Sequence, residues 1–169
     1  IPDGQSREYS YTDKNGGFYY GMTSTDDWGD WYAGWNIYAK RIFADYRLYV
    51  DGERLYRKDA RTSVYPDRLV RHYGKAVETF SLVDESKLLY VRMDSVQGKH
   101  ISLMLIGGNV VDARKDGNSI LYTAKESPEN VIRIAPVKEV GIEFADSLIT
   151  VPASADGFLI AFSTEGESR

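Results

Sequence analysis

Short runs in which apolar and polar positions alternate dominate the chain, and a two-residue period is typical of a β-strand with one buried face. In the run LLYVRM, Leu89, Val91 and Met93 share one face, while Tyr90 and Arg92 share the other. In HISLMLI, apolar residues again occupy every second position. The pattern therefore predicts strands with one face in a core.

Further short β-branched or aromatic runs are SILYTA, NVIRIA, SLITVP and GFLIAFS. Turn-forming sequences separate such runs, at residues 115–118 (KDGN), 127–130 (SPEN) and 156–157 (DG). No segment has the pattern of an amphipathic helix of ordinary length. We predict an all-β fold, an antiparallel β-sandwich of the supersandwich type with about a dozen short strands.

Residues 45–58, DYRLYVDGERLYRK, predict a β-hairpin. Asp51-Gly52 is a strong signal for a two-residue type I′ turn, which needs positive φ at both central positions. Such a turn pairs the arms from Val50 and Glu53 outward to Asp45 and Lys58. One face then carries Leu48 and Leu55, and the other carries the arginines and tyrosines Arg47, Tyr49, Arg54 and Tyr56.

All three tryptophans lie within residues 25–36, TDDWGDWYAGWN. If residues 30–43 form one long strand, Trp31 and Trp35 share a face with Ala33 and Ile37. We expect this face to lie in the core, because it would form a large apolar patch if it were exposed to solvent. Trp28 precedes the strand and is expected in a loop that solvent can reach.

The composition fits one globular domain over residues 1–169, with 43% hydrophobic and 27% charged residues. The net charge of −4 argues against a nucleic acid or an anionic membrane as partner. No run of 18 apolar residues is present, so no membrane span is predicted. The chain opens on Ile1 rather than Met, and we expect it to be the N-terminal part of a longer protein.

Familiar catalytic and cofactor motifs do not occur in the sequence. There is no cysteine, and the only histidines, His72 and His100, lie on separate expected strands, so neither a metal site nor a cofactor is predicted. Gly-x-Ser-x-Gly, P-loop and dinucleotide-binding motifs are missing as well. Asp26, Asp27 and Asp30 could supply the paired carboxylates of a glycosidase, but such a run is more typical of a polar loop. No catalytic residue is predicted.

Two groups of residues could meet a partner. Trp28 with Asp27 and Tyr32 would suit a sugar, whose C–H face stacks on an aromatic ring while its hydroxyls bond carboxylates. In residues 64–74, VYPDRLVRHYG, arginines fall on both faces of the expected strand. That suits an exposed edge strand or a surface that meets another domain. The interdomain candidates are Arg68, Arg71 and His72.

The segments DWYAGWN, KRIFADYRLYVDG and VYPDRLVRHYG resemble the N-terminal β-sandwich domain of bacterial glycogen-debranching-like glycoside hydrolases, of the amylo-α-1,6-glucosidase type. The resemblance is clearest over residues 19–83. It implies a non-catalytic domain that packs on a C-terminal helical barrel, shapes the rim of its active site and could hold part of an α-glucan such as glycogen. It also implies a periplasmic or secreted protein.

Three alternatives stay open at this point. The chain could be a free-standing carbohydrate-binding module, which would bind a glucan without help. It could be a small glycosidase or lyase that uses Asp26, Asp27 or Asp30. It could also be a structural or adhesive surface domain without a ligand.

Overall fold

The computed structural model describes residues 6–14, 16–26, 33–37, 40–83, 86–107, 110–124 and 129–164. Within these ranges the fold is nearly all β, with seventeen strands and two 3-10 helices, η1 (Arg57–Asp59) and η2 (Ala153–Ala155). No described helix is long and apolar enough to cross a membrane. The all-β prediction is confirmed, although the strands are more numerous than expected.

The largest sheet has eight antiparallel strands in the order β12-β13-β14-β17-β10-β9-β8-β7. Its members are β7 (Arg61–Val64), β8 (Leu69–His72), β9 (Val77–Leu82), β10 (Leu88–Asp94), β12 (Val110–Asp116), β13 (Ser119–Ala124), β14 (Asn130–Pro136) and β17 (Gly157–Thr164).

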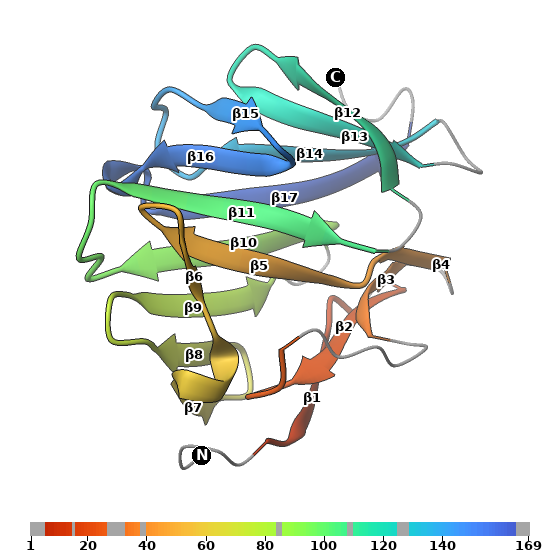
Figure 1. The fold of residues 1–169 in the computed structure, drawn as a ribbon. Coiled ribbons are helices and arrows are strands. Elements are labelled where there is room, and N and C mark those ends of the chain that lie inside the picture. Colours follow the sequence, from red (N-terminus) through yellow and green to blue (C-terminus); the bar gives the residue numbers. More distant parts are fainter. Residues whose placement is uncertain are drawn as a thin grey trace.

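A five-stranded sheet is stacked on this sheet and completes the sandwich (Figure 1). Its order is β15-β16-β11-β5-β6, with β5 (Asp45–Val50), β6 (Glu53–Leu55), β11 (His100–Ile106), β15 (Glu143–Ala145) and β16 (Leu148–Pro152). A smaller sheet of β1 (Glu8–Thr12), β2 (Gly17–Met22), β3 (Gly34–Ile37) and β4 (Lys40–Phe43) lies beside the sandwich, with β1 against β9.

A single hydrophobic core joins the three sheets, and the two-residue period places its members there. Leu89, Val91 and Met93 of β10 are at most 1% exposed, and Ile101 and Leu103 of β11 are completely buried. These are the positions that the alternating pattern assigned to the core. The apolar periodicity of a strand was therefore a sufficient guide to its buried face.

Aromatic rings from all three sheets meet near the centre of this core. Tyr19 of β2 lies 4.6 Å from Phe80 of β9 between ring centroids, and Phe80 stacks on Tyr46 of β5. Trp35 of β3 is completely buried and packs edge-on against Phe43. The core placement of Trp35 is confirmed, while Trp31 lies outside the described residues.

The hairpin prediction is confirmed at the turn and wrong further from it. Asp51 and Gly52 have φ values of 49° and 81°, and β5 pairs with β6 in the expected register from Val50–Glu53 to Leu48–Leu55. The pairing stops there, because helix η1 follows β6 and turns the chain away. The expected pairs of Arg47 with Tyr56 and of Asp45 with Lys58 do not form.

The expected long strand over residues 30–43 is also wrong. The described part of this segment forms two strands, β3 and β4, which pair with each other so that Trp35 lies opposite Phe43. Gly34 makes the close approach possible. Its φ is 95°, and a Cβ atom at this position would lie 1.9 Å from the carbonyl oxygen of Phe43.

Replacement of Gly34 by alanine should lower the free energy of unfolding by about 2–4 kcal/mol, since it adds backbone strain and a clash with Phe43. Gly52→Ala is the matched control. Gly52 also has a positive φ, but a Cβ atom there meets no atom within 4 Å. The only expected cost is therefore backbone strain of about 1 kcal/mol. Urea unfolding of both variants measures the difference, and equal losses would contradict the close approach at Gly34.

Candidate functional site

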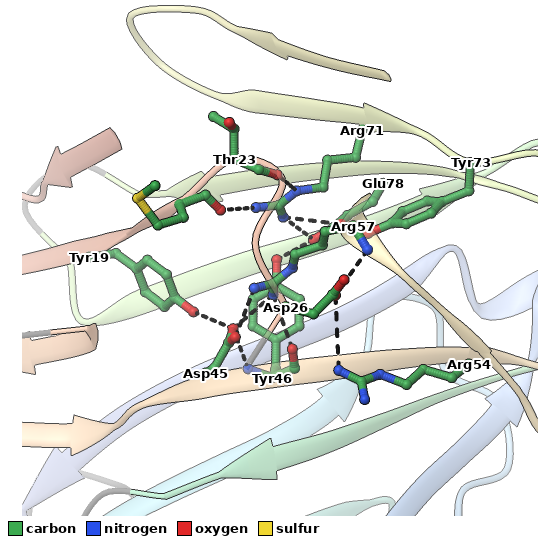
Figure 2. A network of polar contacts seen from close by, with 11 residues as sticks. Tyr19, Thr23, Asp26, Asp45, Tyr46, Arg54, Arg57, Arg71, Tyr73 and Glu78 are labelled. Atoms are coloured by element: carbon green, nitrogen blue, oxygen red, sulfur yellow. Dashed lines mark hydrogen bonds and ion pairs between the residues drawn. The ribbon is translucent and has the colours of Figure 1, made fainter. Parts of the chain in front are cut away.

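Charged and phenolic side chains form a buried network between the three sheets (Figure 2). Arg71 of β8 and Glu78 of β9 are both completely buried, and Nη1 of Arg71 lies 3.3 Å from each Glu78 carboxylate oxygen. The Tyr73 hydroxyl donates to Glu78 at 2.9 Å, and the Tyr46 hydroxyl of β5 donates to its other oxygen. The ion pair lies within the eight-stranded sheet, and the hydrogen bond from Tyr46 links it to the five-stranded sheet.

Arg71 also ties the small sheet to the sandwich. Its Nε donates to the carbonyl oxygen of Thr23 at 3.0 Å, and its Nη2 donates to that of Met22 at 3.2 Å. Both carbonyls belong to the end of β2 and the residue after it. One guanidinium thus satisfies acceptors from two sheets, which the rigid fork of an arginine does well.

A second buried pair lies beside the first. Arg57 of η1 donates to both carboxylate oxygens of Asp45, at 2.8 and 2.7 Å, and to the Tyr46 carbonyl oxygen at 3.0 Å. The backbone N–H groups of Arg57 and Lys58 donate to Asp26, at 2.9 and 3.2 Å. Asp26, which was considered as a catalytic acid, therefore supports the start of η1.

The network keeps Glu78 ionised and its tyrosines protonated. Burial alone would raise the pKa of the Glu78 carboxyl, but Arg71, Arg57 and the hydrogen bonds from Tyr46 and Tyr73 lower this pKa below its ordinary value. Burial, with the charge of Glu78 nearby, raises the pKa of Tyr46 and of Tyr73 well above the ordinary value. Each group is thus held in the protonation state that its hydrogen bond needs.

A small void beside the network, bordered by Asp26, Asp45 and Arg57, has a volume of about 10 Å³. Such a void holds about one water molecule. Arg71 and Glu78 do not border this void, and both side chains are completely buried, so the contacts described for this pair are with other parts of the chain. Among the described residues, no group of three histidine, aspartate or glutamate side chains could hold a metal ion.

Replacement of Glu78 by glutamine should cost about 3–5 kcal/mol of unfolding free energy, because Arg71 is left as a buried charge without its anion. In the native protein the lowered pKa of Glu78 gives stability that is present above the ordinary value of 4.5 and is lost as the pH falls through the folded value. Urea unfolding between pH 7 and pH 3 should show that the unfolding free energy of the variant falls less with decreasing pH than that of the native protein.

Asp94→Asn is the control, since Asp94 pairs with Arg92 at an exposed site and should cost less than about 1 kcal/mol. The unfolding free energy of this control should also fall at low pH as much as that of the native protein. A Glu78→Gln variant as stable as the control would contradict the role of the buried pair.

The predicted sugar-binding residues, Trp28, Asp27 and Tyr32, lie outside the described residues, as does Asp30. The segment that carries them starts after Asp26 and ends before Ala33. Both flanking residues make contacts with the rest of the chain. Asp26 accepts a hydrogen bond from the backbone of η1, and Ala33 is only 2% exposed. The sugar-binding role of the segment stays a prediction.

The three interdomain candidates are placed differently. Arg68 and His72 are exposed, whereas Arg71 is completely buried and serves contacts within this chain. The expectation of an edge strand is wrong, because β8 lies between β7 and β9. Sequence reasoning missed Glu78, although a hairpin through Gly74 and Lys75 places it opposite Arg71.

Exposed aromatic side chains covered by cations lie along the segment that runs from the end of β6 through η1 and β7. Within residues 56–68, the edge segment hereafter, Tyr56 and Tyr65 are each 41% exposed and Val64 is 46% exposed. The Arg54 guanidinium lies 4.6 Å from the ring centroid of Tyr56, and that of Arg68 lies 4.2 Å from Tyr65. Exposed aromatic rings beside arginine are common at the centres of protein interfaces.

A hollow of about 560 Å³ opens beside this segment. Tyr11 of β1, Pro66 and Leu82 contribute apolar surface to it, and Ser10 and Asp67 contribute polar groups. The Tyr11 hydroxyl lies 2.7 Å from the Tyr65 carbonyl oxygen and 2.5 Å from that of Arg68. β1 therefore supports the turn that presents Tyr65.

Comparison of the chain with protein-family models, with curated proteins and with solved structures gave no match.

Proposed function

We propose that this chain is a non-catalytic N-terminal domain of a glycoside hydrolase acting on α-glucans such as glycogen. It packs through the edge segment on a C-terminal catalytic domain, a helical barrel, and shapes the rim of the active site there. The kind of parent enzyme comes from the resemblance of residues 19–83. The observation that carries the proposal is the exposure of two cation-covered tyrosines, Tyr56 and Tyr65, on the edge segment.

The chemistry of the edge segment suits a domain interface. Tyrosine buries a large area while losing little conformational freedom, and a neighbouring arginine can hydrogen-bond an acidic or carbonyl group of the partner. The guanidinium of Arg68 is already held over the Tyr65 ring and beside Asp67 at 2.8 Å. Because the Arg68 side chain is already held in place, little conformational freedom is lost when this surface docks, which favours binding.

The test is binding between this chain and the catalytic domain that follows it in the reading frame, each produced separately and titrated by calorimetry. Tyr65→Ala and Arg68→Ala should each weaken binding about tenfold, because truncating an interface aromatic or arginine commonly costs more than about 1 kcal/mol. In the joined protein, the variants that weaken binding between the domains should also lower the rate of hydrolysis of a branched α-glucan.

Tyr90→Ala and Arg92→Ala are the controls, since both residues lie on the face of β10 that points away from the core. Neither should change the affinity. Lack of binding between the two folded domains, or equal losses in all four variants, would overturn the proposal. Binding of glycogen by this chain without any partner domain would favour a free-standing carbohydrate-binding module.

A further inference from the structure

At one margin of the sandwich, β15 and β16 lie near the β12–β13 hairpin (Figure 1). Residues of these elements border a second opening. We call it the margin slot, and its volume is about 380 Å³, within the range of small-ligand sites. Ile142 and Val151 give it an apolar floor, and both side chains are buried. Its rim carries the polar side chains of His100, Lys115, Asn118 and Glu143.

The polar groups of the rim are available to a ligand. Within the described part of the chain, Lys115 and Glu143 make no ion pair, and Asn118 makes no side-chain hydrogen bond. They come from different elements, Lys115 and Asn118 from the β12–β13 hairpin and Glu143 from β15. Side chains of opposite charge thus converge on one opening without neutralising each other there.

The rim at His100 is held in place by backbone contacts. The Asp51 carboxylate accepts hydrogen bonds from the N–H groups of Lys99 and His100, at 3.0 and 2.9 Å. On the neighbouring strand, the Thr150 hydroxyl shares a hydrogen bond of 2.8 Å with Ser102. The strands that border the slot are therefore fixed before any ligand arrives, which lowers the entropic cost of binding.

We propose that the margin slot binds a neutral sugar unit, and the choice of a glucan rests on the function proposed above. Each sugar hydroxyl both donates and accepts hydrogen bonds. The Lys115 ammonium donates, the Glu143 carboxylate accepts, and the Asn118 amide does both. One cation and one anion on the rim balance, so the site does not select for an ion. The apolar floor suits the C–H face of the ring.

The slot and the edge segment lie at opposite ends of the sheets. β12 and β15 end one side of the two stacked sheets, and β7 and β6 end the other (Figure 1). A domain docked on the edge segment would leave the slot open to solvent. The accessory domain would then hold a distal part of a glucan while the catalytic domain acts on another part.

The test is a titration of the isotopically labelled chain with maltotriose up to roughly 20 mM, followed by amide chemical shifts, with an expected Kd of about 1 mM. Shifts are expected at Asn118, Gly141 and Thr150. Glu143→Ala and Lys115→Ala should each weaken binding at least fivefold. Both residues are exposed, so the variants should fold, which their spectra will verify.

Glu139→Ala is the matched control, an exposed glutamate outside the slot, and it should bind like the native chain. Shifts absent at saturating maltotriose, shifts confined to other residues, or equal binding by Glu143→Ala would overturn the sugar site. Tighter binding of inorganic phosphate at the same amides would overturn the assignment of a neutral ligand. None of these results depends on whether the edge segment docks a catalytic domain.

Discussion

The buried ion pair between Arg71 and Glu78 is the contact on which the arrangement of the three sheets depends. A charge inside a protein is unfavourable unless it is paired and its remaining hydrogen-bonding groups are satisfied. Glu78 meets this condition with hydroxyls from β5 and from the end of β8, and Arg71 meets it with carbonyls from the end of β2. Shifting the five-stranded sheet would remove the Tyr46 hydroxyl from Glu78, and shifting the small sheet would remove the carbonyl acceptors from Arg71. Either shift would leave a buried charged group with an unsatisfied hydrogen bond, so the pair favours one relative placement of the sheets.

The burial of these charged groups also bears on where the surface can bind other molecules. The charged groups near the centre are paired with other groups of the chain, and the void beside them has room for about one water molecule. The two sites proposed above lie at the margins instead, where strands end and side chains face solvent. The two margins differ chemically: the edge segment carries tyrosines under cations, and the margin slot combines an apolar floor with balanced polar groups.

The sequence predicted the buried faces of strands such as β10 and β11, because a two-residue period depends only on which side of a strand is buried. It predicted the Asp51-Gly52 turn because positive φ restricts the residue types there. It did not place Arg71, since an arginine in a strand is usually exposed and its burial depends on a partner from the next strand. The register from the Gly74-Lys75 turn would have paired Arg71 with Glu78. The carbonyls of Met22 and Thr23 could not be found in this way, because their approach depends on the packing of separate sheets.

The order of strands in the sheets places the two proposed sites at opposite margins of one small domain. β6, η1 and β7 follow one another along the chain, and this crossing from one sheet to the other builds the edge segment at a single end. The β12–β13 and β15–β16 hairpins close the other end and border the slot. A partner bound at one end therefore has no direct contact with a ligand at the other. Any coupling between the two must pass through the core, whose buried ion pairs hold the sheets in one arrangement, so independent binding at the two ends is the expected behaviour.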